Sequence, residues 1–333
     1  MRKLWPSCLK LWEIIDMKKY IDTGKKDTRS GFGAGLLEAG RADSRIVALA
    51  ADLTASVKID AFAREFPERF IQCGIAEANM ISAAAGLSVA GKIPFCGSFA
   101  EFISGRVYDQ VRMDVAYARA NVKLASSHSG ITLGEDGATH QTMEDIALMR
   151  ALPGMAVLVP CDCNQTRQAT LAAAKYEGPV YLRFGRPAMP NFTDPDQSFE
   201  IGKIYVMNPG TDVSLLACGH LVWEALQAAE ILENEGISAE VLNVSSIKPL
   251  DVDCLLDSAS RTGAFVIAEE HNMAGGLGEA VCGALAARRP IPVEFINGGD
   301  RFGQSGSPAE LLKVYGMDAV HIAEAARKVI GRK

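Results

Sequence analysis

The sequence has no uninterrupted apolar run near the ~18 residues that a membrane-spanning helix needs, so we expect no membrane segment. Its first sixteen residues are interrupted by charges and lack a small-residue cleavage site, which argues against a secretory signal peptide. Basic residues are not in excess, because 34 Lys and Arg stand against 40 Asp and Glu and the net charge is −6. We therefore expect nucleic acid not to be a main partner.

Cysteine and glycine motifs for metals and dinucleotides are missing as well. Eight cysteines are scattered through the chain, and the close pair Cys161 and Cys163 has no second pair to complete a zinc site. We predict no metal site in this chain, and reduced thiols in a cytoplasmic protein. GFGAG at 31–35 lacks the G-x-G-x-x-G spacing and is interpreted as the glycine-tolerant start of a helix. AGGLGEA at 274–280 fits an anion site or a tight turn equally well.

Apolar runs instead alternate with helical patterns along 333 residues, a length that suits two domains. In the first part, strands are expected at 45–50, 70–73, 93–96, 122–126, 156–159 and 180–183, and helices at 29–41, 57–66, 77–90, 99–118, 142–151 and 164–176. Such alternation predicts an α/β fold with a doubly wound, mainly parallel sheet.

A proline-rich segment separates this part from a second, smaller α/β pattern. Pro187, Pro190 and Pro195 suit neither a helix nor a central strand, so we place a linker there. Beyond it, strands are expected at 213–217, 239–244, 264–268 and 292–296, and helices at 221–235, 251–260, 276–288, 308–314 and 318–330. The expected organisation is an N-terminal extension at 1–26, a first domain at 27–186, the linker at 187–199 and a second domain at 200–333.

The most informative segment is HSGITLGEDGATHQ, between an expected strand and an expected helix. His128 and His140 bracket an acidic turn punctuated by glycines. Histidines and carboxylates in a loop held between regular elements are typical of an active site. The alternative is an ordinary strand-to-helix connection with two solvated histidines.

Other candidate residues also have an ordinary explanation. Glu77 lies in the first turn of an Ala- and Gly-rich helix, where a carboxylate also complements the helix dipole. Phe99 and Phe102 lie three residues apart, which places them on one helical face and fits core residues equally well. The arginines at 29, 106, 112 and 186 fit solvated surface charges.

Taken together, these segments resemble the transketolase family over residues 27 to 330. ADLTAS (51–56), GIAEANM (74–80), SFAEF (98–102) and the histidine loop are similar to its pyrimidine-binding domain. NVSSIKPLD (243–251), AEEHNMAGGLGEA (268–280) and FGQSG (302–306) are similar to its C-terminal domain. The resemblance implies a mainly parallel thiamine-diphosphate pyrimidine-binding domain followed by a smaller C-terminal α/β domain.

The family's GDG…N motif, which holds the cofactor diphosphate through Mg²⁺, is not found in this sequence. The chain therefore resembles the C-terminal subunit of a split transketolase. The resemblance implies a partner, an N-terminal subunit that carries this motif and the magnesium ligands, in an α2β2 assembly where this chain also pairs with its own copy.

The resemblance also implies roles for individual residues. Catalytic roles fall to Glu77, which would bond the aminopyrimidine ring, and to His140, near the reacting carbonyl. The residues implied for the cofactor are Asp52, Leu53, Glu77, Phe99 and Phe102. The residues implied for a sugar phosphate are Arg29, Ser56, His128, Asp136, His140 and Arg186. A carboxylate in a largely apolar cleft can keep a proton near neutral pH, which the role of Glu77 requires.

Two positions depart from the usual transketolase pattern. Ser129 stands where an aspartate commonly follows the first histidine, and Gly105 and Arg106 stand where an aromatic residue is expected. GRVYDQVR resembles deoxyxylulose-phosphate synthase instead. The leading hypothesis is ketol transfer between a ketose phosphate and an aldose or its phosphate. The alternatives are a synthase of that kind, a 2-oxoacid dehydrogenase β-subunit, and a noncatalytic subunit that kept the fold.

Overall fold

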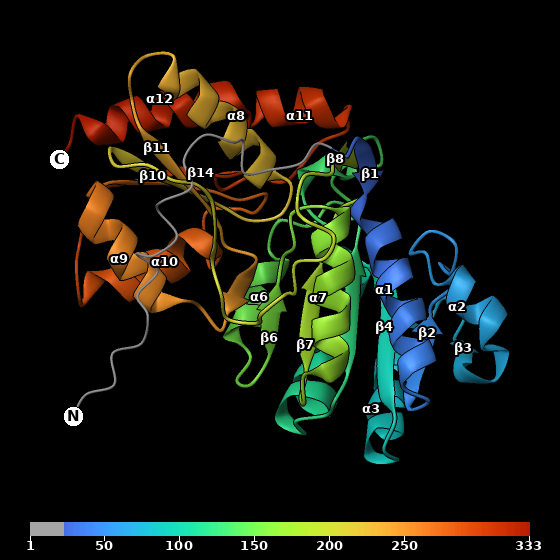
Figure 1. The fold of residues 1–333 in the computed structure, drawn as a ribbon. Helices are drawn as coiled ribbons and strands as arrows, with labels where there is room; N and C mark the ends of the chain where they lie inside the picture. The colour runs from blue at the N-terminus through green and yellow to red at the C-terminus, as the bar shows by residue number, and fades with distance from the viewer. Residues whose placement is uncertain (1–22) are drawn as a thin grey trace, which may run out of the picture.

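The computed structural model describes residues 23–333, so most of the expected N-terminal extension lies outside the described residues. We call residues 23–199 the first half and 200–333 the second half; each is built around its own sheet (Figure 1). The first sheet has the order β12-β6-β7-β5-β4-β2-β3. Its strands are β2 (Ile46–Ala50), β3 (Phe70–Gln72), β4 (Ile93–Phe99), β5 (Lys123–Ser127), β6 (Ala156–Leu158), β7 (Val180–Arg183) and β12 (Ser246–Lys248). All neighbours are parallel except β12 and β6.

Helices cover both faces of the first sheet, which explains why its central strands are buried along their whole length. One face packs against α1 (Thr28–Ala42), α2 (Asp60–Glu65) and α7 (Cys163–Lys175). The other packs against α3 (Glu77–Val89), α6 (Asp145–Ala151) and a π-helix (Val111–Tyr117). α1 and α7 lie side by side in Figure 1.

The second sheet repeats this arrangement on a smaller scale, in the order β14-β13-β10-β11-β9. Its strands are β9 (Tyr205–Asn208), β10 (Val213–Ala217), β11 (Ala239–Asn243), β13 (Phe265–Ala268) and β14 (Val293–Ile296), of which β9 is antiparallel. One face packs against α8 (Leu221–Glu233), α11 (Pro308–Val314) and α12 (Ala319–Ile330), the other against α9 (Val252–Thr262) and α10 (Leu277–Ala286). The predicted α/β class with two doubly wound units is thus confirmed. No helix within residues 23–333 is long and apolar enough to traverse a bilayer.

The expected helix at 99–118 is wrong as a single element. It is divided into α4 (Ala100–Ile103), α5 (Tyr108–Gln110) and the π-helix, with an exposed turn at Gly105 and Arg106 between the first two. The backbone amide and hydroxyl of Ser104 both bond the carbonyl of Ala100, and the amide of Arg106 bonds that of Glu101, closing α4 after one turn. The amphipathic pattern continues through this break, which is why the sequence predicted one helix.

Several short strands were not predicted, because three or four residues give too little pattern. β1 (Lys25–Asp27), from the expected extension, pairs antiparallel with β8 (Ala188–Pro190), from the expected linker. β12 belongs to the second half in sequence but extends the first sheet. The Nζ of Lys248 in β12 donates to the carbonyls of Arg150 (2.9 Å) and Leu152 (2.6 Å). The two halves therefore share a sheet, and one apolar core runs through both.

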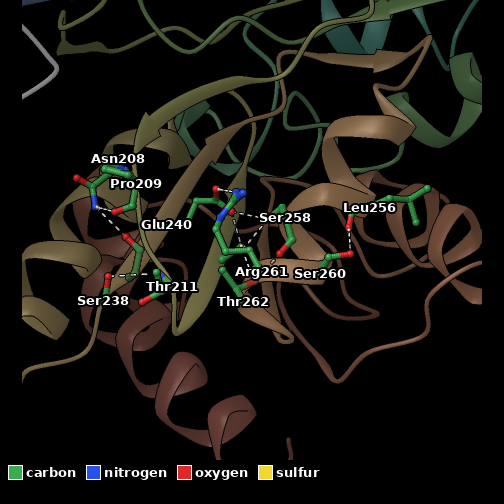
Figure 2. A network of polar contacts seen from close by, with 12 residues as sticks. Asn208, Pro209, Thr211, Ser238, Glu240, Leu256, Ser258, Ser260, Arg261 and Thr262 are labelled. Carbon is green, nitrogen blue, oxygen red and sulfur yellow. Dashed lines mark hydrogen bonds and ion pairs between the residues drawn. The ribbon is translucent and has the colours of Figure 1, made fainter. Parts of the chain in front are cut away.

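A buried carboxylate fastens β11 to α9 in the second half. Glu240 is fully buried and accepts hydrogen bonds from the hydroxyls of Ser214 and Ser258. Figure 2 shows Glu240 with Ser258 and with Arg261, with which it forms an ion pair. Because a buried charge is tolerated when it is paired and hydrogen-bonded, this cluster is a structural feature of the second core.

The glycines of GFGAG serve helix packing. A Cβ built on Gly31 would lie 2.1 Å from the carbonyl oxygen of Cys163 at the start of α7, whereas one built on Gly283 in α10 meets no atom within 4 Å. We expect Gly31→Ala to lower the free energy of unfolding by about 1–3 kcal/mol, because it overpacks the α1–α7 contact. The matched variant Gly283→Ala should be neutral or stabilising by about 0.5–1 kcal/mol. Denaturant unfolding of the full chain measures both, and equal effects would contradict the packing argument.

Candidate functional site

The predicted site residues gather at one edge of the first sheet. Asp52 and Leu53 follow β2, Phe99 ends β4, His128 follows β5, and Arg186 comes shortly after β7. Because these strands are parallel, their carboxyl ends meet at the same edge, where open α/β sheets bind ligands. Asp52 is exposed and Leu53 is half-buried against the core.

Four of these side chains form a cluster of rings. The rings of Phe99 and Phe102 are stacked with centroids 5.6 Å apart. The ring centroid of His128 lies 3.8 Å from that of Phe99, and that of His140 lies 5.4 Å from that of Phe102. Phe99 ends a strand and Phe102 lies in α4, so the two share a face without sharing a helix. Both are half-buried and present ring area that a planar heterocycle can stack on.

Glu77 lies beside this ring cluster, 4% exposed, in the first turn of α3. The surroundings of Glu77 are more polar than the largely apolar cleft that we expected. The Nη1 of Arg106 lies 3.2 Å from both carboxylate oxygens. The same guanidinium lies over the ring of Phe102, 3.8 Å from its centroid. Arg106 therefore takes up part of the hydrogen-bonding capacity of this carboxylate, and at 46% exposed it has room to move away. The sequence had placed Arg106 among surface charges, and only its departure from the family pattern marked it.

Cationic groups stand next to the rings. The hydroxyl of Thr28 donates to the carbonyl of Gly185 (3.0 Å), which brings the start of α1 to the end of β7. The Arg29 guanidinium donates to the carbonyl of Ser56 (3.1 Å) and pairs with Asp27 (3.2 Å). Burial lowers the pKa of Arg29; Asp27 opposes this, and the charge of Arg186 lowers it further. The charge of Arg186 thus acts on Arg29, and Arg29 contacts the backbone of Ser56.

Arg186 already has a carboxylate partner. Its Nη1 donates to the carbonyl of Leu133 and to a carboxylate oxygen of Glu135, both at 2.9 Å. Glu135 is exposed, and its pKa is lowered by a hydrogen bond from its own backbone amide and by the bond from Arg186. Glu135 therefore occupies a donor of Arg186, and no pattern in the sequence indicated this pairing.

The loop from 128 to 141 is folded into tight turns. A 3₁₀ turn, η4 (Ile131–Leu133), is flanked by Gly130 and Gly134, which both have positive φ. His128 also has positive φ, at 59°, an uncommon conformation for a non-glycine residue that is often associated with a functional site. His128 is buried, His140 is half-buried and Asp136 is exposed, so the three predicted sugar-facing residues differ in their access to solvent.

A cavity of about 340 Å³ lies beside the end of this loop, between the two halves. It is lined by Gln141, Met143, Glu144, Asn272, Asp300, Arg301, Phe302 and Gly303. None of the predicted site residues lines this cavity. The cluster of rings and the arginines Arg29 and Arg186 therefore lie outside it, at the carboxyl edge of the first sheet.

These features define a class of protein: a two-unit α/β subunit with aromatic, acidic and cationic groups at the carboxyl edge of a parallel sheet. The chain belongs to the transketolase family. The family model for the transketolase pyrimidine-binding domain matches residues 24–191, and that for the transketolase C-terminal domain matches residues 202–322. The resemblance found in the sequence is thereby confirmed: the chain is a transferase subunit of the kind formed by the C-terminal section of a split transketolase.

Three similar proteins define the extent of the match. The chain is 45% identical over 298 residues to the 6-deoxy-6-sulfo-D-fructose transketolase subunit SqwH of a Clostridium species, covering 90% of this chain and 92% of that protein. It is 38% identical over 307 residues to human transketolase, covering 91% of this chain but 49% of the human protein. A solved structure described as a split gene transketolase, inactive beta4 tetramer, has a TM-score of 0.85 at 44% identity, covering 92% of this chain and 99% of that one.

The protonation of His128 is a testable consequence of its position. Burial, followed by the charges of Arg29, Arg186 and His140, lowers the pKa of His128 to about 3. Below an unfolded pKa of ~6.5 the unfolded chain binds a proton that the folded chain does not. His128 therefore reduces stability progressively as pH falls from ~6.5 towards 3, and it is neutral in the folded state at pH 7.

We expect the ring resonances of His128 in the histidine-labelled full chain to show no titration between pH 8 and 5. NMR spectra of the wild type and of His128→Gln would assign the signal. A midpoint near that of a free imidazole, ~6.5, would contradict the buried, cation-flanked environment.

Proposed function

We propose that this chain supplies the pyrimidine-binding side and the sugar-binding side of a thiamine-diphosphate-dependent transketolase. The reaction is transfer of a two-carbon ketol unit from a ketose phosphate to an aldose or aldose phosphate. The observation that carries this proposal is the placement of Glu77 beside the stacked rings of Phe99 and Phe102. The guanidinium groups of Arg29 and Arg186 lie at the same edge of the sheet, where their charges act on His128.

The residues present fit the pyrimidine end of that cofactor. When bound, thiamine diphosphate supplies an electron sink for the carbanion of ketol transfer. Phe99 and Phe102 offer stacked faces to a planar ring, and Asp52 and Leu53 border the same edge. Glu77, once Arg106 has moved, offers a carboxyl group to hold a proton against a ring nitrogen. We assign Glu77 the proton-handling role at this ring.

We assign the residues that bind the sugar phosphate from their charge and from their position at the edge of the sheet. Arg29 and Arg186, with Ser56 and His128 beside them, would bind the terminal anion of the sugar, since guanidinium forks match phosphate oxygens. Neutral His128 can exchange hydrogen bonds without adding a third positive charge to those of Arg29 and Arg186. Asp136 would accept from a sugar hydroxyl, and His140 would bond the ketose near its carbonyl. One similar protein is named for a 6-sulfo sugar, so the substrate of this chain can carry either a phosphate or a sulfonate as its terminal anion.

The remaining half of the site is assigned to another polypeptide. Among residues 23–333 no group of three or more His, Cys, Asp or Glu could hold a metal ion. We assign Mg²⁺ and the cofactor diphosphate to an N-terminal subunit with the GDG…N motif. The β4 tetramer described as inactive supports self-pairing of this chain and its dependence on a partner, which in our proposal completes an α2β2 assembly. We keep the cytoplasm, expected from the sequence, as the proposed location of this complex.

The decisive variant is Glu77→Gln, assayed in the complex that this chain forms with the N-terminal subunit. We expect ketol transfer from xylulose 5-phosphate to fall at least ~10²-fold, the range of a lost general acid–base contribution. The isolated chain should show no transfer. Full activity of Glu77→Gln would contradict a catalytic role of this chain and favour the hypothesis of a noncatalytic subunit. Pyruvate consumption in place of ketol transfer would favour the synthase or dehydrogenase alternatives.

A second variant tests the anion site. Glu135→Gln removes the carboxylate that pairs with Arg186, so phosphorylated substrates should bind more tightly. We expect KM for the ketose phosphate, and the inhibition constant of inorganic phosphate, to fall about two- to fivefold, the scale of a surface ion pair. Glu233→Gln, an exposed change of the same charge at the end of α8, is the matched control. Equal effects of the two variants would indicate that the change in KM comes from the net charge of the protein, which would contradict a specific role of Glu135 beside Arg186.

A further inference from the structure

We propose that Glu270, in the second half, is a positioning residue that holds the sugar-facing loop of the first half in its binding conformation. This inference rests on the proposed function. Glu270 follows β13 and is 5% exposed. One of its carboxylate oxygens, Oε2, accepts from the backbone amide (3.0 Å) and the hydroxyl (2.8 Å) of Thr132. Thr132 lies in η4, midway between His128 and Asp136.

The loop is shaped around this carboxylate. Gly130 has φ of 76°, and a Cβ built there would lie 2.4 Å from the Oε2 of Glu270, so the backbone passes directly against it. Glu270 is itself fixed, because its carbonyl accepts from Nη2 of Arg183 (2.8 Å), whose Nε pairs with buried Asp145 (2.7 Å). Because the backbone of Glu270 is fixed by Arg183 and its carboxylate is bound by Thr132, Glu270 fixes the position of the turn that contains Thr132.

His220 extends the same cluster to the anion site. Its Nδ1 lies 3.3 Å from the hydroxyl of Thr132 and 3.6 Å from Oε1 of Glu270. Since the Thr132 hydroxyl gives its proton to Glu270, it accepts from Nδ1 of His220. The imidazole packs on Gly185, where a Cβ would lie 2.2 Å from its Cε1, and Gly185 precedes Arg186. Glu270 and His220 thus touch the backbone of both segments assigned to the sugar.

The far end of the loop is held from the second half as well. The side-chain amide of Gln141 donates to the carbonyls of Ile131, Gly134 and Gln304 at 3.0, 3.2 and 3.0 Å. A Cβ on Gly137 would lie 2.6 Å from the hydroxyl of Ser305. The residues assigned to the pyrimidine lie outside this loop, in α3, β4, α4 and the turn after β2, and the loop reaches them only through the rings of His128 and His140. Loss of Glu270 should therefore impair sugar binding more than cofactor binding.

The chain offers a matched control next to Glu270. Glu269 is 1% exposed, and its carboxylate accepts from the amides of Leu277 (2.6 Å) and Gly278 (2.8 Å) at the start of α10. Both residues carry buried carboxylates with two hydrogen bonds, but the side-chain contacts of Glu269 are made within the second half. In the complex with the N-terminal subunit, Glu270→Ala should raise KM for xylulose 5-phosphate at least ~10-fold, as expected when a binding group is misplaced. Thiamine diphosphate affinity should fall by a clearly smaller factor, because the loop touches the pyrimidine-binding residues only through His128 and His140.

Glu269→Ala should leave this KM unchanged, and Glu270→Gln, whose amide oxygen can still accept both bonds from Thr132, should restore most of the lost affinity. A KM for Glu270→Ala equal to that of Glu269→Ala would overturn the proposal. So would a loss of cofactor affinity by the same factor, because that would indicate a general structural defect.

A second measurement is independent of enzymatic activity and of the proposed function. Hydrogen exchange of the full chain reports local opening, and we expect the amides of residues 128–141 to exchange at least about tenfold faster in Glu270→Ala than in Glu269→Ala. If the alanine variant does not fold, Thr132→Val, which removes one bond, replaces it and Thr132→Ser is its control. Unchanged exchange in the loop would overturn the positioning role even if no ketol transfer is found.

Discussion

The parallel pairing of β2, β4, β5 and β7 is the constraint on which the rest of the molecule depends. The register sets Ala50 beside Gly97 and Ser126 beside both Ser98 and Arg183, so separate connections leave the sheet at one edge. The strands are buried on both faces, and a slip of one residue would exchange the side chains of the two cores. The candidate site is therefore carried by a tightly packed sheet, and its groups range from buried Glu77 and His128 to exposed Asp136.

The second half takes part in that site without supplying its chemistry. β12 extends the first sheet, one apolar core passes between the halves, and Glu270 and Gln304 bind the loop that carries His128 and His140. A glycine-punctuated loop has little conformational preference of its own, so contacts from outside must select one form. This explains why the two units are joined by buried polar contacts as well as by an apolar surface.

Charges at the site are already paired within the chain. Arg29 with Asp27, Arg186 with Glu135 and Arg106 with Glu77 each join a cation to a carboxylate, and in the last two the arginine is more than one-third exposed. Exposed pairs contribute little to stability, because water screens them and long side chains lose entropy in forming them. This holds for Arg186 with Glu135, whereas Glu77 is buried and its carboxylate would need another partner if Arg106 moved away. Each arginine at the candidate site is thus held by a carboxylate of this chain, and the charges of Arg29 and Arg186 also act on His128.

The sequence by itself determined the α/β class, the doubly wound pattern and the family, because buried strands, amphipathic helices and motifs such as GEDGATHQ are local features. The family resemblance also assigned the ring and cation residues to one site, and their common place at one edge of the sheet became visible with the parallel strands of the structure. The sequence failed where partners are distant in the chain: Arg106 on Glu77, Glu135 on Arg186, β12 in the first sheet and Glu270 on Thr132. No periodicity encodes such pairs. They arise when packing brings segments separated by up to 138 residues within hydrogen-bond distance, and only the tertiary structure decided them.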